Sequence, residues 1–177
     1  GYWSDHQIIY LQKLLEFAAD AHPGRLPALW NRPIFAYADV PYRLRPYAEM
    51  LADWYNTIDF DEERHEAIAQ SVEEMGTDAR LHRDANGDVI HVTMIEKLLV
   101  LLLAKMTNLV PDGGIWMNTQ RPEWNDANNA LVGKGLSVVT VAYLRWFVAA
   151  WRAELNQSTT ETFDVSETVL TLLDAVA

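Results

Sequence analysis

Cysteine is absent from this 177-residue sequence, which excludes disulfide scaffolds, cysteine nucleophiles and thiolate metal sites. Long apolar runs are absent too: the longest, residues 98–104, is flanked by Lys97 and Lys105, whereas a membrane-spanning helix needs about 20 residues. The chain opens without an initiator methionine, and no basic region followed by an apolar stretch indicates a signal peptide. We therefore expect a cytoplasmic protein that is the interior of a longer polypeptide, although the lack of cysteine is also compatible with secretion.

Basic residues are scarce relative to acidic ones. The 14 Lys and Arg stand against 25 Asp and Glu, which gives a net charge of −11. Such a chain repels phosphate backbones and anionic lipid, so neither nucleic acid nor a membrane is an expected partner. Half of the residues are apolar and only 22% are charged, as in globular domains. A chain of this length can bury roughly 70% of the surface that it exposes when unfolded, which allows one sizeable core.

Apolar residues recur at spacings of three and four, the helical period, over most of the chain. Together with the caps, this pattern predicts helices over residues 5–21, 46–54, 61–75, 94–109, 136–155 and from about 164 to 177. A further helix is expected to begin at Asn125 or Asp126. Asn86-Gly87 predicts the tight turn of a β-hairpin near residues 80–92. We predict an all-α (mostly helical) fold with that one short β-hairpin, in a single segment spanning residues 1–177.

Three segments bear on packing. Residues 94–109 and 136–155 are apolar on most faces. Within the first, residues 98–103 are expected to be buried on all sides, and the second is expected to pack inside other helices. The other helices are too few to cover them, which predicts that the remainder of the same polypeptide, or a second copy in a homo-oligomer, completes the fold. The stretch 25–42 is rich in proline and aromatic residues and predicts an ordered, irregular loop of a kind that is often functional.

The densest group of chemistry-bearing side chains is residues 118–129, Asn-Thr-Gln-Arg-Pro-Glu-Trp-Asn-Asp-Ala-Asn-Asn. Amides, carboxylates and arginine bind sugar hydroxyls, an indole stacks on a pyranose face, and glycosidic cleavage requires a carboxylic acid. The stretch therefore predicts a carbohydrate site, with Asp126 and Glu123 as catalytic candidates. The predicted substrate-binding residues here are Gln120, Arg121, Trp124 and Asn128. In the simpler interpretation, Asn125 or Asp126 only caps the following helix.

A second cluster of the same character, Trp3-Ser4-Asp5-His6-Gln7, lies at the start of the helix predicted over residues 5–21. It adds Trp3 and Asp5 to the predicted substrate contacts. The alternative is that Asp5 only caps the helix and complements its dipole.

Trp124-Asn125-Asp126 resembles the Trp-Asn-Asp motif of the cellobiose and chitobiose phosphorylase group, within the six-hairpin, (α/α)6-toroid glycosidases. The resemblance implies that Asp126 is the general acid and that Trp124 lines the sugar site. It also implies a toroid, and because this chain has about half of the helices that a toroid takes, the chain would be about half of the barrel.

The second cluster carries a weaker resemblance. Asp5-His6-Gln7 is similar to the group's Arg-Asp-x-x-Gln element, whose Asp holds sugar hydroxyls. Ser4 stands where that element has Arg, and Gln7 is one residue too close. In the first motif, Glu123 replaces the Asp that commonly precedes the Trp.

The reaction could be hydrolysis or phosphorolysis of an oligosaccharide or glycoside. In an inverting hydrolase a second carboxylate, roughly 6.5–9.5 Å from the acid, activates water; in a phosphorylase, inorganic phosphate attacks as co-substrate and transfers the glycosyl group. The candidate second carboxylates are Asp5, Asp39, Asp112 and Glu123. No cofactor is expected, and no metal, because no two histidines have the i, i+4 spacing of a zinc helix.

A function of another class is a non-catalytic helical module that binds sugar or a protein partner, because protein interfaces also favour Trp, Tyr and Arg. Residues 84–88 begin like a calcium loop, but their glycine is at the fourth position instead of the sixth, so a hairpin turn is predicted there. Gly133-Lys134-Gly135 lacks the other residues of a phosphate-binding loop and is interpreted as a helix irregularity.

Overall fold

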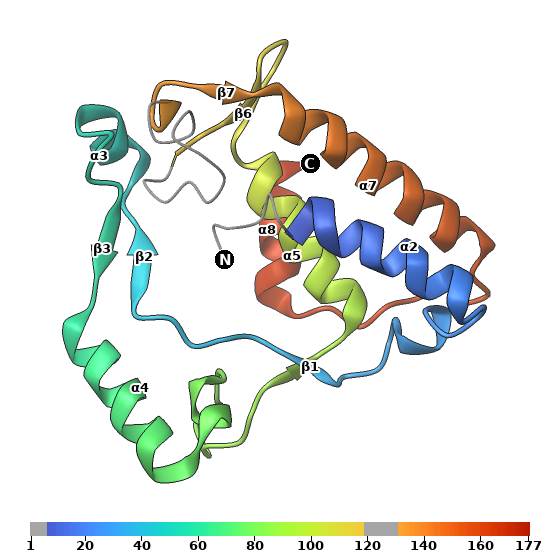
Figure 1. Ribbon diagram of the computed structural model, residues 1–177, viewed down its shortest axis with the longest axis horizontal. Helices are drawn as coiled ribbons and strands as arrows, with labels where there is room; N and C mark the ends of the chain where they lie inside the picture. The colour runs from blue at the N-terminus through green and yellow to red at the C-terminus, as the bar shows by residue number, and fades with distance from the viewer. Residues whose placement is uncertain (1–6, 119–130) are drawn as a thin grey trace.

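The computed structural model describes residues 7–118 and 131–177, and about 54% of it is helical. The prediction of a mostly helical protein is confirmed. Four helices gather on one side of the molecule (Figure 1): α2 (Gln12–Ala21), α5 (Met94–Met106), α7 (Val138–Gln157) and α8 (Glu167–Val176). On the other side, an arm of short strands carries α3 (Tyr47–Ala52) and α4 (Glu62–Met75). No helix in the described part of the chain has the length and apolar content needed to cross a membrane.

Polar side chains cap the starts of three of the six α-helices in the described residues. The side chain of Asp61 accepts the backbone N–H of Arg64 at the start of α4, as the prediction of a helix over residues 61–75 requires. Thr93 and Ser137 cap α5 and α7 in the same way. A π-helical turn, η1 (Gln7–Leu11), leads into α2, so the predicted helix over 5–21 is confirmed within the described residues.

The hydrophobic core surrounds α5. The buried cluster consists of Ile8, Leu26, Trp30, Met94, Leu98, Leu101, Ile115, Leu144, Phe147 and Trp151. Trp30 is only 1% exposed and contacts the rings of Trp151 and Phe163 edge-on, at centroid distances of 6.4 and 6.1 Å. Trp30 comes from the proline-rich loop, so the loop predicted over residues 25–42 is held by the core itself.

Within the described chain, neither residues 98–103 nor the helix over 136–155 is buried on all sides, and apolar side chains are left exposed, as the small number of covering helices predicts. On α7, Leu144, Phe147 and Trp151 are buried, whereas Val139 is 63% and Trp146 is 38% exposed. This helix meets the core along one face, and no described residue covers the other face. On α5 the burial is more complete, but Leu99, Val100 and Leu102 are only half-buried.

Strands occur outside the one predicted hairpin. In the arm, β2 (Tyr42–Leu44) and β3 (Ile58–Phe60) form an antiparallel ribbon. Beside the core, β5 (Leu109–Val110), β6 (Gly114–Trp116) and β7 (Leu136–Ser137) form a sheet in the order β5-β6-β7. Each strand has two or three residues, which is too short for the alternation of apolar and polar residues that marks a strand in sequence.

The predicted turn near residues 80–92 is present, but its geometry differs from the prediction. Arg83 pairs with Val89, and only Gly87 has a positive φ, of 88°. The carboxylate of Asp84 accepts the N–H groups of Asn86 and Asp88 at 2.9 and 3.0 Å, so the side chain builds the loop. These bonds, that from Asp88 foremost, lower the pKa of Asp84.

The arms of this turn pair with the proline-rich loop as well as with each other. β4 (His91–Val92) is antiparallel to β1 (Phe35–Ala36), and Leu81 pairs with Ala38. A short 3-10 helix, η2 (Pro27–Leu29), precedes β1. The predicted irregular loop therefore contains the strand β1. This strand forms by pairing with β4, which is distant in sequence.

A buried carboxylate holds α8 against α5. Glu96 is 3% exposed and accepts the backbone N–H of Ser166 at 2.7 Å, the Ser166 hydroxyl at 3.1 Å and the Tyr37 hydroxyl at 3.2 Å. The Lys97 ammonium lies 4.1 Å from the centroid of the Tyr37 ring. Burial, and then the Glu96 carboxylate, raises the pKa of Tyr37, and burial lowers the pKa of Lys97.

This arrangement predicts an alkaline loss of stability that depends on Tyr37. Because the folded state raises the Tyr37 pKa, its contribution to stability is complete below the ordinary tyrosine pKa of about 10 and is lost as the pH rises further. Denaturant unfolding between pH 8 and 11 should show a steeper decline for the wild type than for Tyr37→Phe. Tyr55→Phe removes an exposed hydroxyl and is the control. Equal slopes for the wild type and Tyr37→Phe would contradict the prediction.

Candidate functional site

The eight residues that the sequence predicts as catalytic or substrate-binding lie outside the described part of the chain. These are Trp3, Asp5, Gln120, Arg121, Glu123, Trp124, Asp126 and Asn128. The described chain stops at Asn118 and resumes at Leu131. The described residues around Asn118 and Leu131 are therefore those that flank the predicted site in sequence.

Backbone hydrogen bonds hold the chain before Asn118 against the chain after Leu131. The N–H of Met117 donates to the carbonyl of Gly135 at 3.1 Å, and the N–H of Gly133 donates to the carbonyl of Met117. The indole N–H of Trp116 donates to the carbonyl of Gly133 at 3.1 Å. The segments on either side of residues 119–130 are thus hydrogen-bonded to each other beside Trp116.

Gly133 is a positioning residue, a role that the sequence analysis did not assign to it. Its φ is +72°, and a Cβ added to it would lie 2.3 Å from the Cβ of Trp54, so only glycine fits without displacing Trp54. Lys134 lies over the same indole, with its ammonium 3.7 Å from the ring centroid. The signal in the sequence was the Gly-Lys-Gly triplet, which we interpreted as a helix irregularity. In the structure, Gly133 and Lys134 of this triplet contact Trp54, which follows α3.

A groove lies where the arm meets the helical side of the molecule, and we call it the β2–α5 groove. It has a volume of about 540 Å³, within the usual range for small-molecule sites. Its lining comes from β2, α3, the end of α5 and the end of β6. The twelve lining residues are Tyr42, Arg43, Leu44, Arg45, Tyr47, Met50, Ala104, Lys105, Thr107, Asn108, Trp116 and Asn118.

Two aromatic rings meet in this groove. Tyr47 and Trp116 contact edge to face, with centroids 5.8 Å apart and planes at 81°. Trp116 is half-buried and oriented by its indole hydrogen bond, while Tyr47 is 64% exposed. A ring fixed at its edge with a face open to solvent is suited to stacking on an apolar sugar face.

Two amides continue the groove toward residue 119. The Asn118 amide donates to the Asn108 side-chain oxygen at 3.0 Å, and the Asn108 amide donates to the Ala104 carbonyl at 3.1 Å. The Asn108 carbonyl also accepts the N–H of Trp116. This chain of bonds orients Asn118 and leaves its side-chain oxygen able to accept a hydrogen bond from a ligand hydroxyl.

The charges of the groove are positive. Arg43, Arg45 and Lys105 line it, and its twelve described lining residues include no Asp or Glu. Arg45 forms an ion pair with Asp59 of β3 at 2.8 Å. The described lining can bind a ligand through rings, amides and cations, but it contains no carboxylic acid to protonate a leaving group.

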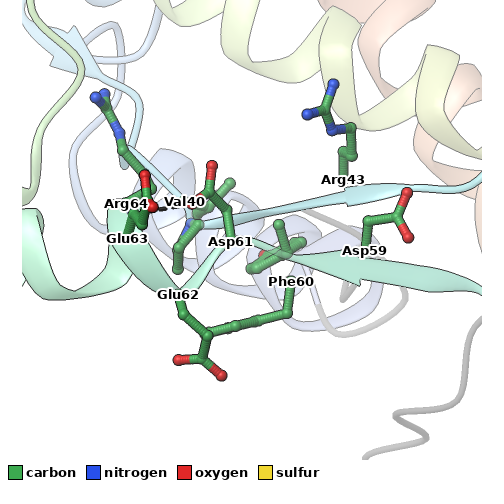
Figure 2. Close-up of a pocket in the computed structure, with 10 residues that line it drawn as sticks. Val40, Arg43, Asp59, Phe60, Asp61, Glu62, Glu63 and Arg64 are labelled. Atoms are coloured by element: carbon green, nitrogen blue, oxygen red, sulfur yellow. Dashed lines mark hydrogen bonds between the residues drawn. The ribbon is translucent and has the colours of Figure 1, made fainter.

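A second depression follows the β2–β3 ribbon into α4 and contains several carboxylates (Figure 2). Its Asp61 caps α4, and its Arg64 forms an ion pair with Asp39 beyond its rim. These groups are exposed or engaged in holding the arm together, so this depression is the weaker candidate. In residues 7–118 and 131–177, no three His, Asp or Glu side chains are grouped to hold a metal ion.

Two of the proposed second carboxylates are in the described structure, and neither lines the β2–α5 groove. Asp39 is paired with Arg64. Asp112 is exposed in the turn between β5 and β6, with a φ of 58°. The other two candidates, Asp5 and Glu123, lie outside the described residues.

Comparison with known proteins adds no family to these observations. No protein-family model and no curated protein sequence matches the chain.

Proposed function

We propose that this chain is part of the catalytic domain of an (α/α)6-toroid carbohydrate-active enzyme, in which Asp126 protonates the leaving oxygen of a glycosidic bond. The supporting observation is that the β2–α5 groove, with its Tyr47 and Trp116 rings and its amides, ends at Asn118. Asn118 is the first residue of the stretch 118–129 that the sequence predicts to be a carbohydrate site. A groove that can hold a sugar is thus lined by a residue that is close in sequence to the acid motif.

In this proposal the sequence motifs keep the roles that the resemblance implies. Trp124 lines the sugar site, and Glu123 is one candidate for a second carboxylate. The remaining contacts to the saccharide come from Trp3, Asp5, Gln120, Arg121 and Asn128. The reaction is hydrolysis if a carboxylate activates water, and phosphorolysis if inorganic phosphate attacks; a sugar phosphate that forms only when phosphate is added would identify the latter.

The groove itself gives the most direct test. Tyr47→Ala in the full-length enzyme should weaken binding of its oligosaccharide substrate roughly 3- to 10-fold, because one stacking face is lost. Tyr55→Ala removes a similarly exposed ring outside the groove lining and should leave binding unchanged. Affinity is measured by calorimetric or NMR titration. Equal affinities for the wild type and Tyr47→Ala would contradict a saccharide role for this groove.

A second candidate function, a protein-assembly module, is favoured by the exposed apolar residues of two helices. Leu14 and Phe17 on α2, and Val138 and Val139 on α7, are each more than 60% exposed. Contiguous surfaces of this kind on soluble proteins usually mark interfaces. The same surfaces also fit the toroid proposal, in which the remainder of the polypeptide or a second copy covers them.

The isolated 177-residue chain should therefore bind a hydrophobic dye and associate with itself in sedimentation at micromolar concentration. A compact monomer that binds no dye would contradict both the assembly module and the incomplete toroid.

A cytoplasmic location stays a prediction from the sequence.

A further inference from the structure

We infer that the β2–α5 groove takes a saccharide that carries an oxyanion, a carboxylate or a phosphate, and that Arg43 binds this group. The inference rests on the proposed function, because it names the substrate class of the same groove. It depends on the distribution of charge around the β2–β3 ribbon.

The groove is positive in a protein that is strongly negative. The whole chain has a net charge of −11, yet the described lining carries three cationic side chains and no carboxylate. Carboxylates are plentiful just outside it: Asp59, Asp61, Glu62 and Glu63 line the neighbouring depression, whose lining shares Tyr42 and Arg43 with the groove. The exclusion of acidic side chains from the groove therefore separates it from its surroundings, and it favours an anionic ligand there.

The ion pair of the ribbon leaves one guanidinium without a partner among the described residues. Arg43 stands opposite Asp59 in the β2–β3 register, but Asp59 pairs with Arg45 instead. Its backbone belongs to the β2–β3 ladder, but the Arg43 side chain has no hydrogen bond or ion pair with another described residue. Figure 2 shows its guanidinium on one side of the ribbon and the Glu62 carboxylate on the other. No described residue therefore uses the donors of the Arg43 guanidinium, which can bind a ligand.

The neighbours of Arg43 determine what kind of anion fits. A guanidinium binds a carboxylate or a phosphate with two parallel hydrogen bonds. The same groove offers the exposed Tyr47 ring and the Asn118 amide oxygen, which suit a ring with hydroxyl groups. A small inorganic anion would use Arg43 alone, whereas an acidic sugar uses all three. The groove thus fits a charged saccharide better than a free anion.

The experiment compares sugars that differ only in charge. The wild-type protein is titrated by NMR with glucose and glucuronate, galactose and galacturonate, glucose 6-phosphate, and with acetate and inorganic phosphate as free oxyanions. We expect at least one acidic sugar to bind roughly 10-fold or more tightly than its neutral counterpart, with an affinity that falls as salt is added.

Variants then assign the effect to Arg43. Arg43→Gln should remove the preference for the acidic sugar while neutral sugars bind as before, and Arg43→Lys should restore part of it because the charge returns. Arg152→Gln, which removes an exposed cation of α7, is the matched control and should change nothing. Circular dichroism of each variant verifies that the fold is retained.

The possible failures are distinguishable. If acidic and neutral sugars bind equally well, or if Arg43→Gln keeps the preference, the inference is overturned while the proposed function stands. If acetate or inorganic phosphate binds as tightly as the matching acidic sugar, the groove is a free-anion site and the inference is also overturned. If no sugar binds, both the inference and the saccharide role of the groove are overturned.

Discussion

Asp126→Asn in the full-length enzyme is expected to lower the turnover number roughly 10²- to 10⁴-fold. Asparagine keeps the shape of the side chain but has no acidic proton to give to the leaving oxygen. Thermal stability should change little, because Asn and Asp cap a helix about equally well. The measurement is kcat on the natural glycoside, together with the melting temperature of each protein.

The matched control is Asp174→Asn, which removes a carboxylate from an exposed position of α8 and should leave kcat unchanged. Glycosides with an activated leaving group such as dinitrophenolate need little protonation, so Asp126→Asn should lose much less activity on them. Unaltered turnover on the natural substrate, or an equal loss on both kinds of substrate, would refute the assignment of Asp126 as the acid.

Trp30→Ala is expected to lower the free energy of unfolding by about 3–5 kcal/mol. Trp30 is 1% exposed, its ring contacts those of Trp151 and Phe163, and its carbonyl accepts the N–H of Ile95 in the first turn of α5. Removing the indole leaves a cavity where the proline-rich loop, α7 and the segment before α8 meet. A domain with about 5–15 kcal/mol of total stability would lose a large share of it.

Trp146→Ala provides the comparison for the same chemical change. This tryptophan lies on the outer face of α7 and is 38% exposed, so its removal should cost less than about 1 kcal/mol. Urea unfolding of both variants measures the difference. Similar losses for the two substitutions would mean that Trp30 does not have the central place in the core that its burial indicates.

The sequence predicted the kind of ligand that the groove suits, but not most of the residues that line it. The residue types of 118–129 indicated a sugar site, and Asn118 of that stretch does line the groove. Tyr47, Asn108 and Arg43 were not selected, because they lie 10 to 75 residues from Asn118 in sequence and carry no motif of their own. Gly133 was noticed, but its function depends on Trp54, a residue that local pattern cannot pair with it.

The helices follow from local sequence, because a helix depends on contacts three and four residues apart and on local caps such as Asp61. The acidic net charge and the turn at 84–88 follow from local sequence as well. In contrast, the buried face of α7, the strand at Phe35–Ala36 and the pairing of Arg45, instead of Arg43, with Asp59 are properties of the folded chain. Strand pairing, burial and ion pairing join residues far apart in the chain, so their geometry is fixed only when the distant segments have packed.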